Sequence, residues 1–178
     1  MPMPMEFEVD LESWLSSVQR TARVDVDGSA CVISVHYGGA PADLWAAMTN
    51  RDHLARWFGV VSGEPPALEV DIGLPSPVPV FVLACEAPSR LVVNWQSPIL
   101  PRRTMDEIVV TLVGEAQGTR LTVEHRSSEP EVWLGAGSGW DHWLCMFAYE
   151  LAGAPPPDEE ALGIRLMPVW LGVRPTGS

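Results

Sequence analysis

The sequence predicts an α+β fold in which helices are segregated from a curved antiparallel sheet. Three observations predict it. Segments of alternating apolar residues, separated by short turns, fill 21–37 and 60–127. Two short helical segments lie between them, and the longest helical pattern follows the last strand. This order lacks the strand–helix–strand alternation of nucleotide-binding folds, so we expect one domain with a sheet against a long C-terminal helix.

The N-terminal part predicts a short helix followed by a hairpin. Asp10 can cap a helix, because its side chain accepts hydrogen bonds from the free amides of a first turn. Apolar residues then recur at helical spacing up to Val18, so we expect an amphipathic helix near residues 10–20. Its apolar side must lie on the domain or on a second copy of the chain. Residues 21–37 alternate around Asp27-Gly28, a pair typical of tight turns, and predict a hairpin.

Two short helices and a series of strands come next. Pro41 suits the first turn of a helix, and Gly59 suits a helix end. Between them, Thr49 or Asn50 can end one helix and cap the next. From residue 60 to 127, alternating apolar residues between Pro and Gly turns predict antiparallel strands. In the last of these strands, His125 continues an apolar face.

The longest helix is expected inside residues 131–152. The glycine-rich residues 135–139 match neither the phosphate-loop spacing nor the GxSxG spacing, and we expect them to form a loop before the helix. Asp141 and His142 are neighbours in the helix and point about 100° apart, so we expect both to face solvent rather than each other. The apolar stripe has the spacing of one buried face: Trp140, Trp143, Leu144, Phe147 and Leu151.

The chain divides into three parts on this basis. Residues 1–20 are an N-terminal extension, residues 21–153 form the domain, and residues 154–178 form a Pro-rich tail. Asp158 can cap a short helix in the tail, which we expect to end near Pro168 because proline disfavours helix interiors.

Composition narrows the classes of function. The formal net charge is −12 and the eleven cations are scattered, which argues against general nucleic-acid binding. The cysteines Cys31, Cys85 and Cys145 are odd in number and widely spaced, which argues against a disulfide framework or a zinc site.

The chain shows no signal peptide and no apolar run long enough to span a membrane, so we expect a cytoplasmic protein without membrane insertion. Eight tryptophans are unusually many, and some of these rings could line a cavity.

Residues 43–59, DLWAAMTNRDHLARWFG, carry a resemblance to a known family. They resemble the helix–turn–helix signature of the activator of Hsp90 ATPase homolog 1-like family, which belongs to the START/Bet v 1-like (SRPBCC) superfamily. The resemblance extends over about residues 21–153 and departs at Arg51, where the family often has proline. The matching segments are, in order, Pro41, 44–49, Asp52 and 53–59, with Gly139-Trp140 further along.

The resemblance implies a helix-grip fold, in which the sheet wraps round the long C-terminal helix and a cavity lies between them. It does not imply one function. Members of the superfamily bind lipids and hormones, cyclise polyketides or act on chaperones, so the fold alone decides little.

The candidate ligand-binding residues are aromatic, with one histidine. Rings on two faces of a cavity would suit a flat ligand, but apolar residues at helical spacing are also what a packed core requires. His125 is either a structural histidine or a group that contacts a ligand or transfers a proton. The set is Trp57, Phe58, Trp95, His125, Trp140, Trp143 and Phe147.

Three hypotheses of function follow. The first is a binding module for a hydrophobic or aromatic small molecule, with no catalytic residue, metal or cofactor expected. The second is a polyketide cyclase- or aromatase-like enzyme, for which His125 with Asn94 or an arginine would be the candidates. The third is a protein-interaction module related to Hsp90 co-chaperones, which only the family name suggests. A homodimer is a further expectation, because the N-terminal helix could pack on a second copy.

Overall fold

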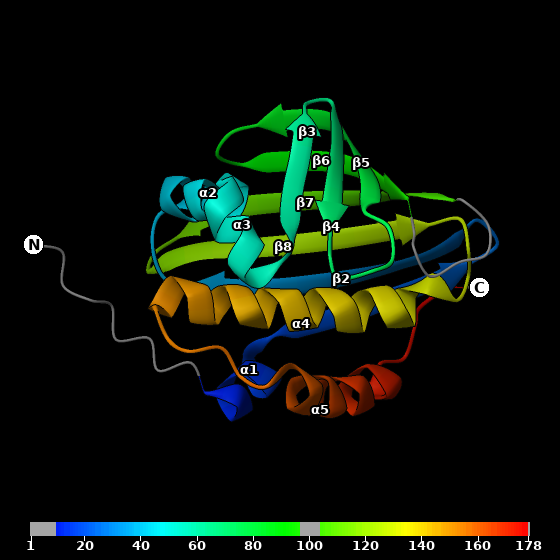
Figure 1. Cartoon of the computed structure of the whole chain (residues 1–178). Coiled ribbons are helices and arrows are strands. Elements are labelled where there is room, and N and C mark those ends of the chain that lie inside the picture. Colours follow the sequence, from blue (N-terminus) through cyan, green and yellow to red (C-terminus); the bar gives the residue numbers. More distant parts are fainter. Residues whose placement is uncertain (1–9, 97–103, 178) are drawn as a thin grey trace, which may run out of the picture.

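The computed structural model describes residues 10–96 and 104–177 and contains an eight-stranded antiparallel sheet. The strand order is β1-β2-β8-β7-β6-β5-β4-β3. In Figure 1, β3 and β4 run across the direction of β7 and β8, so the sheet is strongly curved. Its strands are β1 Gln19–Asp25, β2 Gly28–Tyr37, β3 Val60–Glu64, β4 Ala67–Asp71, β5 Val78–Glu86, β6 Arg90–Gln96, β7 Met105–Glu115 and β8 Gly118–Ser127.

The helices form layers on one side of the sheet. Helix α4, Val132–Ala152, packs on β2 and β8, and α1, Leu11–Ser17, and α5, Glu159–Gly172, lie on the other side of α4 (Figure 1). Helices α2, Pro41–Thr49, and α3, Arg51–Trp57, connect β2 to β3. The predicted α+β, helix-grip (START/Bet v 1-like) architecture is confirmed.

The sheet positions its inward side chains by simple alternation. On β7, Ile108, Val110 and Leu112 are buried, and on β8, Leu121 and Val123 are buried. The register pairs His125 with Ile108 on one side and with Cys31 on the other. Directly paired residues send their side chains to the same face, so this face forms the wall that α4 covers.

Local signals of the sequence explain the N-terminal elements. The Asp10 side chain accepts hydrogen bonds from the backbone amides of Glu12 and Ser13 and caps α1 as predicted. Trp14 is buried, and its ring centroid lies 6.4 Å from that of Tyr37. The apolar side of α1 therefore lies on the domain itself.

The linker helices also follow their predicted caps. Asn50 ends α2 and caps α3, accepting from the amides of Asp52 and His53. The amide of Gly59 donates to Leu54 O, which closes α3 and sends the chain into β3. This tight end fixes where Trp57 and Phe58 leave the helix.

Helix α4 begins earlier than expected, and the prediction of a loop at residues 135–139 is wrong. Gly135, Gly137 and Gly139 all lie inside the helix, and Gly137 is buried on the side of α4 that faces α5. At Gly137, an added Cβ would lie 2.4 Å from a ring carbon of Trp170 on α5, so this glycine allows the two helices to approach. Leu151, assigned to the sheet-facing stripe, is 38% exposed.

Helix α5 continues past Pro168, so the expected end near that residue is also wrong. Asp158 caps it as predicted, accepting from the amide of Ala161. Proline removes one intrahelical hydrogen bond, and burial of Leu162, Leu166 and Trp170 on α4 offsets that loss. Beyond the helix, Thr176 exchanges two backbone hydrogen bonds with Val24 and Ala22 of β1.

Replacing two glycines of α4 tests this packing. We expect Gly137→Ala to lower the free energy of unfolding by roughly 1–3 kcal/mol, because the new methyl group overpacks against Trp170. Gly139→Ala meets no atom within 4 Å and should raise that free energy by up to about 1 kcal/mol, since alanine favours helix. Urea unfolding of both variants measures the difference, and equal shifts would contradict the role of Gly137.

Candidate functional site

The structure brings all of the predicted ligand-binding residues into one group, which we call the aromatic cluster. Its rings come from the end of α3, from β6, from β8 and from α4, so four separate segments of the chain meet here. Each ring lies within 6.5 Å, centroid to centroid, of at least one other member. The members are Trp57, Phe58, Trp95, His125, Trp140, Trp143 and Phe147.

Phe58 is the centre of the cluster. Its ring stacks on Trp140 at 5.7 Å with an interplanar angle of 13°, and it meets Trp143 edge-on at 4.7 Å. Trp95 lies 6.5 Å away on the sheet side. Offset stacks and edge-to-face pairs are the favoured aromatic geometries. Phe58 therefore joins rings from the sheet and from α4 into one apolar surface.

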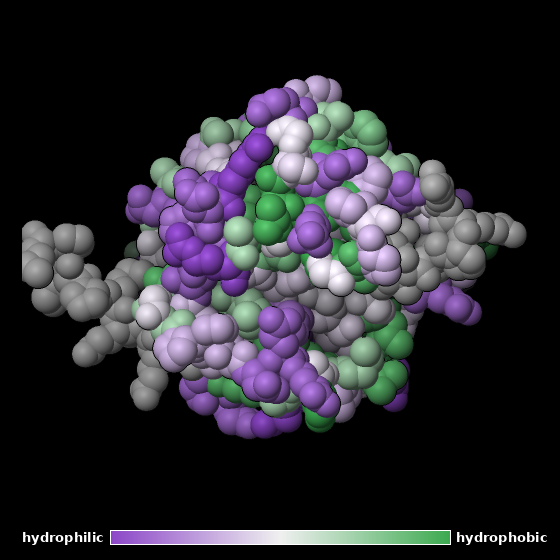
Figure 2. Space-filling view, viewed as in Figure 1, coloured by the Kyte–Doolittle hydropathy of each residue, from purple (hydrophilic) through white to green (hydrophobic). Residues whose placement is uncertain are grey.

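Burial divides the cluster into an inner and an outer part. Phe147 is fully buried against Trp57 at 4.7 Å and Tyr37 at 5.4 Å, whereas Phe58 and Trp143 are only partly buried. The cluster therefore reaches the surface at Phe58 and Trp143. Figure 2 shows hydrophobic residues in the middle of the face on which β3 and β4 lie, with hydrophilic residues around them.

His125 lies at the inner end with two side-chain partners. Its Nε2 is 2.9 Å from Asp106 Oδ2, and Trp140 Nε1 donates to its Nδ1 at 3.0 Å. An indole N–H can only donate, so Nδ1 accepts and the neutral ring carries its proton on Nε2, which donates to Asp106. All three residues are buried. The geometry thus fixes the tautomer and the direction of the ring.

Sequence reasoning missed Asp106, although the signal was present. Asp106 precedes Ile108 and Val110 by two and four residues and shares their inward alternation on β7. Asn94, expected as a partner of His125, neighbours the inward-facing Trp95 on β6 and therefore points to the opposite face of the sheet. Asn94 is not part of this site, and Asp106 takes the place that was proposed for it.

Some buried polar atoms around the cluster have no hydrogen-bond partner in the part of the chain that the structure describes. Trp95 and Asp106 face each other directly in the β6–β7 register, and each contributes one such atom. Buried polar groups are partnered in the great majority of cases. The unpartnered atoms are Trp57 Nε1, Trp95 Nε1, Thr104 Oγ1 and Asp106 Oδ1.

Comparison with known proteins identifies the family. Residues 39–151, well over half of the chain, match the family described as activator of Hsp90 ATPase homolog 1-like protein. The chain belongs to this family. The matched segment contains the aromatic cluster, the signature helices α2 and α3, and nearly all of α4. No curated protein matches the sequence.

Solved structures show the same fold at low identity. CalU16 from Micromonospora echinospora is 20% identical, with 89% of this chain and 98% of that chain covered and a TM-score of 0.71. DynU16, of the dynemicin biosynthetic locus, is 25% identical over 72% of this chain, which spans 49% of that chain, with a TM-score of 0.63. The Aha1 dimer from Colwellia psychrerythraea is 13% identical, with 69% and 96% covered and a TM-score of 0.60.

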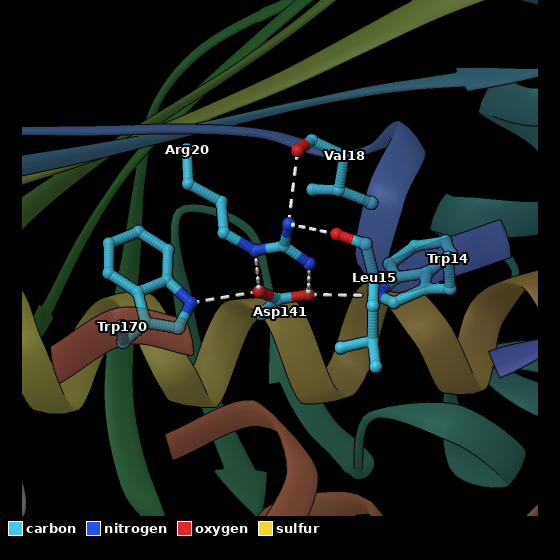
Figure 3. Close-up of polar contacts among 6 residues, drawn as sticks. All are labelled: Trp14, Leu15, Val18, Arg20, Asp141 and Trp170. Atoms are coloured by element: carbon cyan, nitrogen blue, oxygen red, sulfur yellow. Dashed lines mark hydrogen bonds and ion pairs between the residues drawn. The ribbon is translucent and has the colours of Figure 1, made fainter. Parts of the chain in front are cut away.

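A second buried polar group lies on the other face of α4, and it corrects the expectation that Asp141 faces solvent. Asp141 is fully buried. Trp14 Nε1 donates to its Oδ1 and Trp170 Nε1 to its Oδ2, both at 2.8 Å, and Arg20 pairs with both oxygens (Figure 3). His142 points elsewhere, with its Nε2 3.6 Å from Glu159 Oε2 and its side chain 20% exposed.

The Asp141 group is saturated and joins the family domain to its flanking segments. The remaining Nη1 of Arg20 donates to the carbonyls of Leu15 and Val18, each at 3.0 Å. Trp14, Arg20 and Trp170 all lie outside the matched residues 39–151. We therefore assign this group to stability rather than to binding.

The two buried cysteines do not suit nucleophilic chemistry. Burial raises the pKa of the Cys31 and Cys145 thiols to about 12, so both stay protonated at neutral pH. Among residues 10–96 and 104–177, no group of three or more potential metal ligands is found, and no helix is long and apolar enough to cross a membrane.

Removing the Asp141 carboxylate tests its structural assignment. We expect Asp141→Ala to lower the free energy of unfolding by roughly 3–5 kcal/mol, because Arg20 is left buried without its partner. Glu69→Ala, an exposed carboxylate on β4, is the control and should change it by less than about 0.5 kcal/mol. Chemical denaturation compares the two, and a small effect at Asp141 would refute the assignment.

Proposed function

We propose that this protein binds a flat, hydrophobic aromatic small molecule at the aromatic cluster. The observation that carries the proposal is the meeting of six aromatic side chains and His125 from four segments of the chain, with Phe58 and Trp143 reaching the surface. A binding pocket of mostly apolar side chains with a few polar groups is the usual form of a small-molecule site.

Stacking is the interaction that such a ligand would use. Phe58 and Trp143 are partly exposed and meet edge-on, and both rings contact Trp95 and Trp140 within the cluster. Each aromatic pair contributes about 0.5–1.5 kcal/mol beyond its buried area. Two or three such contacts would give a selective site for planar ligands.

A cyclase- or aromatase-like enzyme is the second candidate, and the buried His125–Asp106 pair favours it. An imidazole held by a carboxylate is a common general base. In this fold, however, Trp140 and Asp106 occupy both ring nitrogens of His125. Proton transfer to a ligand would first require one of these bonds to break, so binding remains the function we favour.

Other partners are proposed from the charge of the chain and from its relatives rather than from the aromatic cluster. The cytoplasm stays our expected location, and the net charge of −12 argues against binding to nucleic acid or to anionic membranes. The Aha1 dimer from Colwellia psychrerythraea, which shares the fold, motivates a test of self-association. Only the family name suggests a chaperone partner. A pull-down with this protein as bait that does not enrich Hsp90 would contradict that hypothesis.

Two phenylalanine variants separate binding from core packing. We expect Phe58→Ala to weaken binding of naphthalene-type probes by about tenfold, because the central stacking ring is lost. Phe147→Ala removes a fully buried ring and should lower the free energy of unfolding by roughly 3–5 kcal/mol. Tryptophan fluorescence titration and urea unfolding measure the two effects.

Trp133→Phe is the control, because its ring pairs with Trp170 outside the cluster and is not a cluster member. Its probe affinity should match that of the unmodified protein. If no planar aromatic probe changes the fluorescence of the unmodified protein or shifts its unfolding, the cluster is only a core and the proposal fails.

A further inference from the structure

Two unpartnered polar atoms lie at the inner end of the aromatic cluster. Asp106 is fully buried and Trp95 is 6% exposed, yet Asp106 Oδ1 and Trp95 Nε1 have no partner within residues 10–96 and 104–177. The two residues are directly opposite in the β6–β7 ladder. Directly opposite side chains leave the same face of the sheet with Cβ atoms about 4.5–5.5 Å apart. The residue with the free acceptor and the residue with the free donor therefore occupy neighbouring positions on one face of the sheet.

The carboxylate is held so that one oxygen remains available. His125 takes Asp106 Oδ2, and Trp140 fixes His125 in turn. Trp95, which carries the donor, contacts both Trp140 and Trp143 within the cluster. The polar pair is thus continuous with the apolar surface proposed to bind the ligand.

The same protein shows what a purely structural buried carboxylate looks like. Asp141 uses both oxygens, with donors from Trp14, Arg20 and Trp170. Asp106 uses only one. Leaving a buried charged acceptor half-satisfied costs free energy, and a ligand that completes it recovers that cost.

We propose that the ligand carries a hydroxyl group on its aromatic ring, which donates to Asp106 Oδ1 and accepts from Trp95 Nε1. This inference rests on the proposed aromatic binding and adds the chemical class of the ligand: a phenol or a related ring hydroxyl. A hydroxyl both donates and accepts through one oxygen, whereas an ether or a ketone only accepts. A buried water can make the same two bonds, and the hydroxyl takes its position.

Three matched probes test the hydroxyl: 2-naphthol, 2-methoxynaphthalene and naphthalene, titrated by tryptophan fluorescence. We expect 2-naphthol to bind about tenfold more tightly than 2-methoxynaphthalene, because a hydrogen bond to a charged acceptor is gained. In a purely apolar site, 2-naphthol should bind more weakly than both other probes, because its hydroxyl group costs the most free energy to remove from water.

Two variants locate the recognition. Asp106→Asn retains an oxygen for His125 and presents an N–H₂ donor in place of the free oxygen, so the advantage of 2-naphthol should disappear. Trp95→Phe keeps a ring but removes the donor, and should weaken 2-naphthol more than naphthalene. Glu107→Gln, the next residue on the other face of β7, is the control and should leave all affinities unchanged.

Each outcome decides the inference. Equal binding of the three probes overturns it and leaves the proposed aromatic binding intact. A preference for 2-naphthol that persists in both Asp106→Asn and Trp95→Phe shows that the hydroxyl is recognised elsewhere and also overturns it. If none of the probes binds, the proposed function and this inference both fail.

A second inference rests on a different surface, the outer face of α5. Ile164, Met167 and Leu171 are 64%, 41% and 58% exposed, although they follow helical spacing on one side of the helix. The opposite side of α5 is the one packed on α4. Hydrophobic residues at the lower edge of Figure 2 lie where Figure 1 places α5. This exposed stripe has no partner among the residues described.

Charge at the two ends of the stripe indicates what covers it. Glu160 lies four residues before Ile164, and Arg174 lies three residues after Leu171, with its guanidinium donating to Leu171 O. We infer that a second copy of the chain packs here with the two α5 helices antiparallel. That arrangement brings Glu160 near Arg174 of the partner subunit and Ile164 near the partner's Leu171, whereas a parallel pair would align like charges.

Sedimentation equilibrium tests this dimer. We expect a mass of twice the 19.4 kDa chain at micromolar concentration, and Ile164→Glu should give monomer. Arg174→Glu should weaken association, and the charge swap Glu160→Arg with Arg174→Glu should restore it. Val26→Glu, a change at a residue 94% exposed in the hairpin turn, is the control and should have no effect. A monomer at all concentrations, or a dimer that persists in Ile164→Glu, overturns the inference.

Discussion

The ion pair between Asp141 and Arg20 is the interaction on which the arrangement of this chain depends. Helix α4 carries apolar residues on two sides, so it needs cover from the sheet on one side and from α1 and α5 on the other. Asp141 provides one acceptor for groups from α1, β1 and α5. Breaking a buried ion pair by removing one partner is strongly destabilising, so the ion pair and the two indole donors hold these three segments at one point. This arrangement fixes α4 in place, and with it the side chains that α4 presents to the sheet.

Two buried carboxylates, on opposite sides of the same helix layer, illustrate different uses of the same chemistry. Asp141 is completely paired by its own chain and joins the flanking segments to the family domain. Asp106 is held by His125 on one oxygen only and lies beside the cluster of aromatic rings. The first carboxylate stabilises the packing of segments that lie outside the family match, residues 39–151. The second leaves a polar group facing an apolar surface, which is the combination that orients a small ligand.

The sequence predicted what is local and missed what depends on distant partners. The caps at Asp10, Asn50 and Asp158 follow from interactions within a few residues, and all are present. The predicted hairpin is present too, with Val26 and Asp27 in its turn and Gly28 paired with Asp25. Asp106 could have been found, because it shares the alternation of Ile108. The burial of Asp141 could not, since its donors lie 29 to 127 residues away in the sequence. The same holds for Gly137 of α4, because Trp170, which packs against it, lies in a different helix.

The hydrogen bonds of His125 determine how the cluster can act. With Nδ1 accepting from Trp140 and Nε2 directed at Asp106, the imidazole has no free nitrogen to offer a ligand. Its effect is to fix the carboxylate and to hold Trp140 against Phe58. Affinity in such a site would come from the stacked rings, which are tolerant of many planar molecules. Selectivity would come from the one oxygen and the one indole N–H that stay unused, because a ligand unable to satisfy them leaves both buried and unpaired. A site built in this way discriminates among aromatic ligands by a single polar substituent rather than by overall shape.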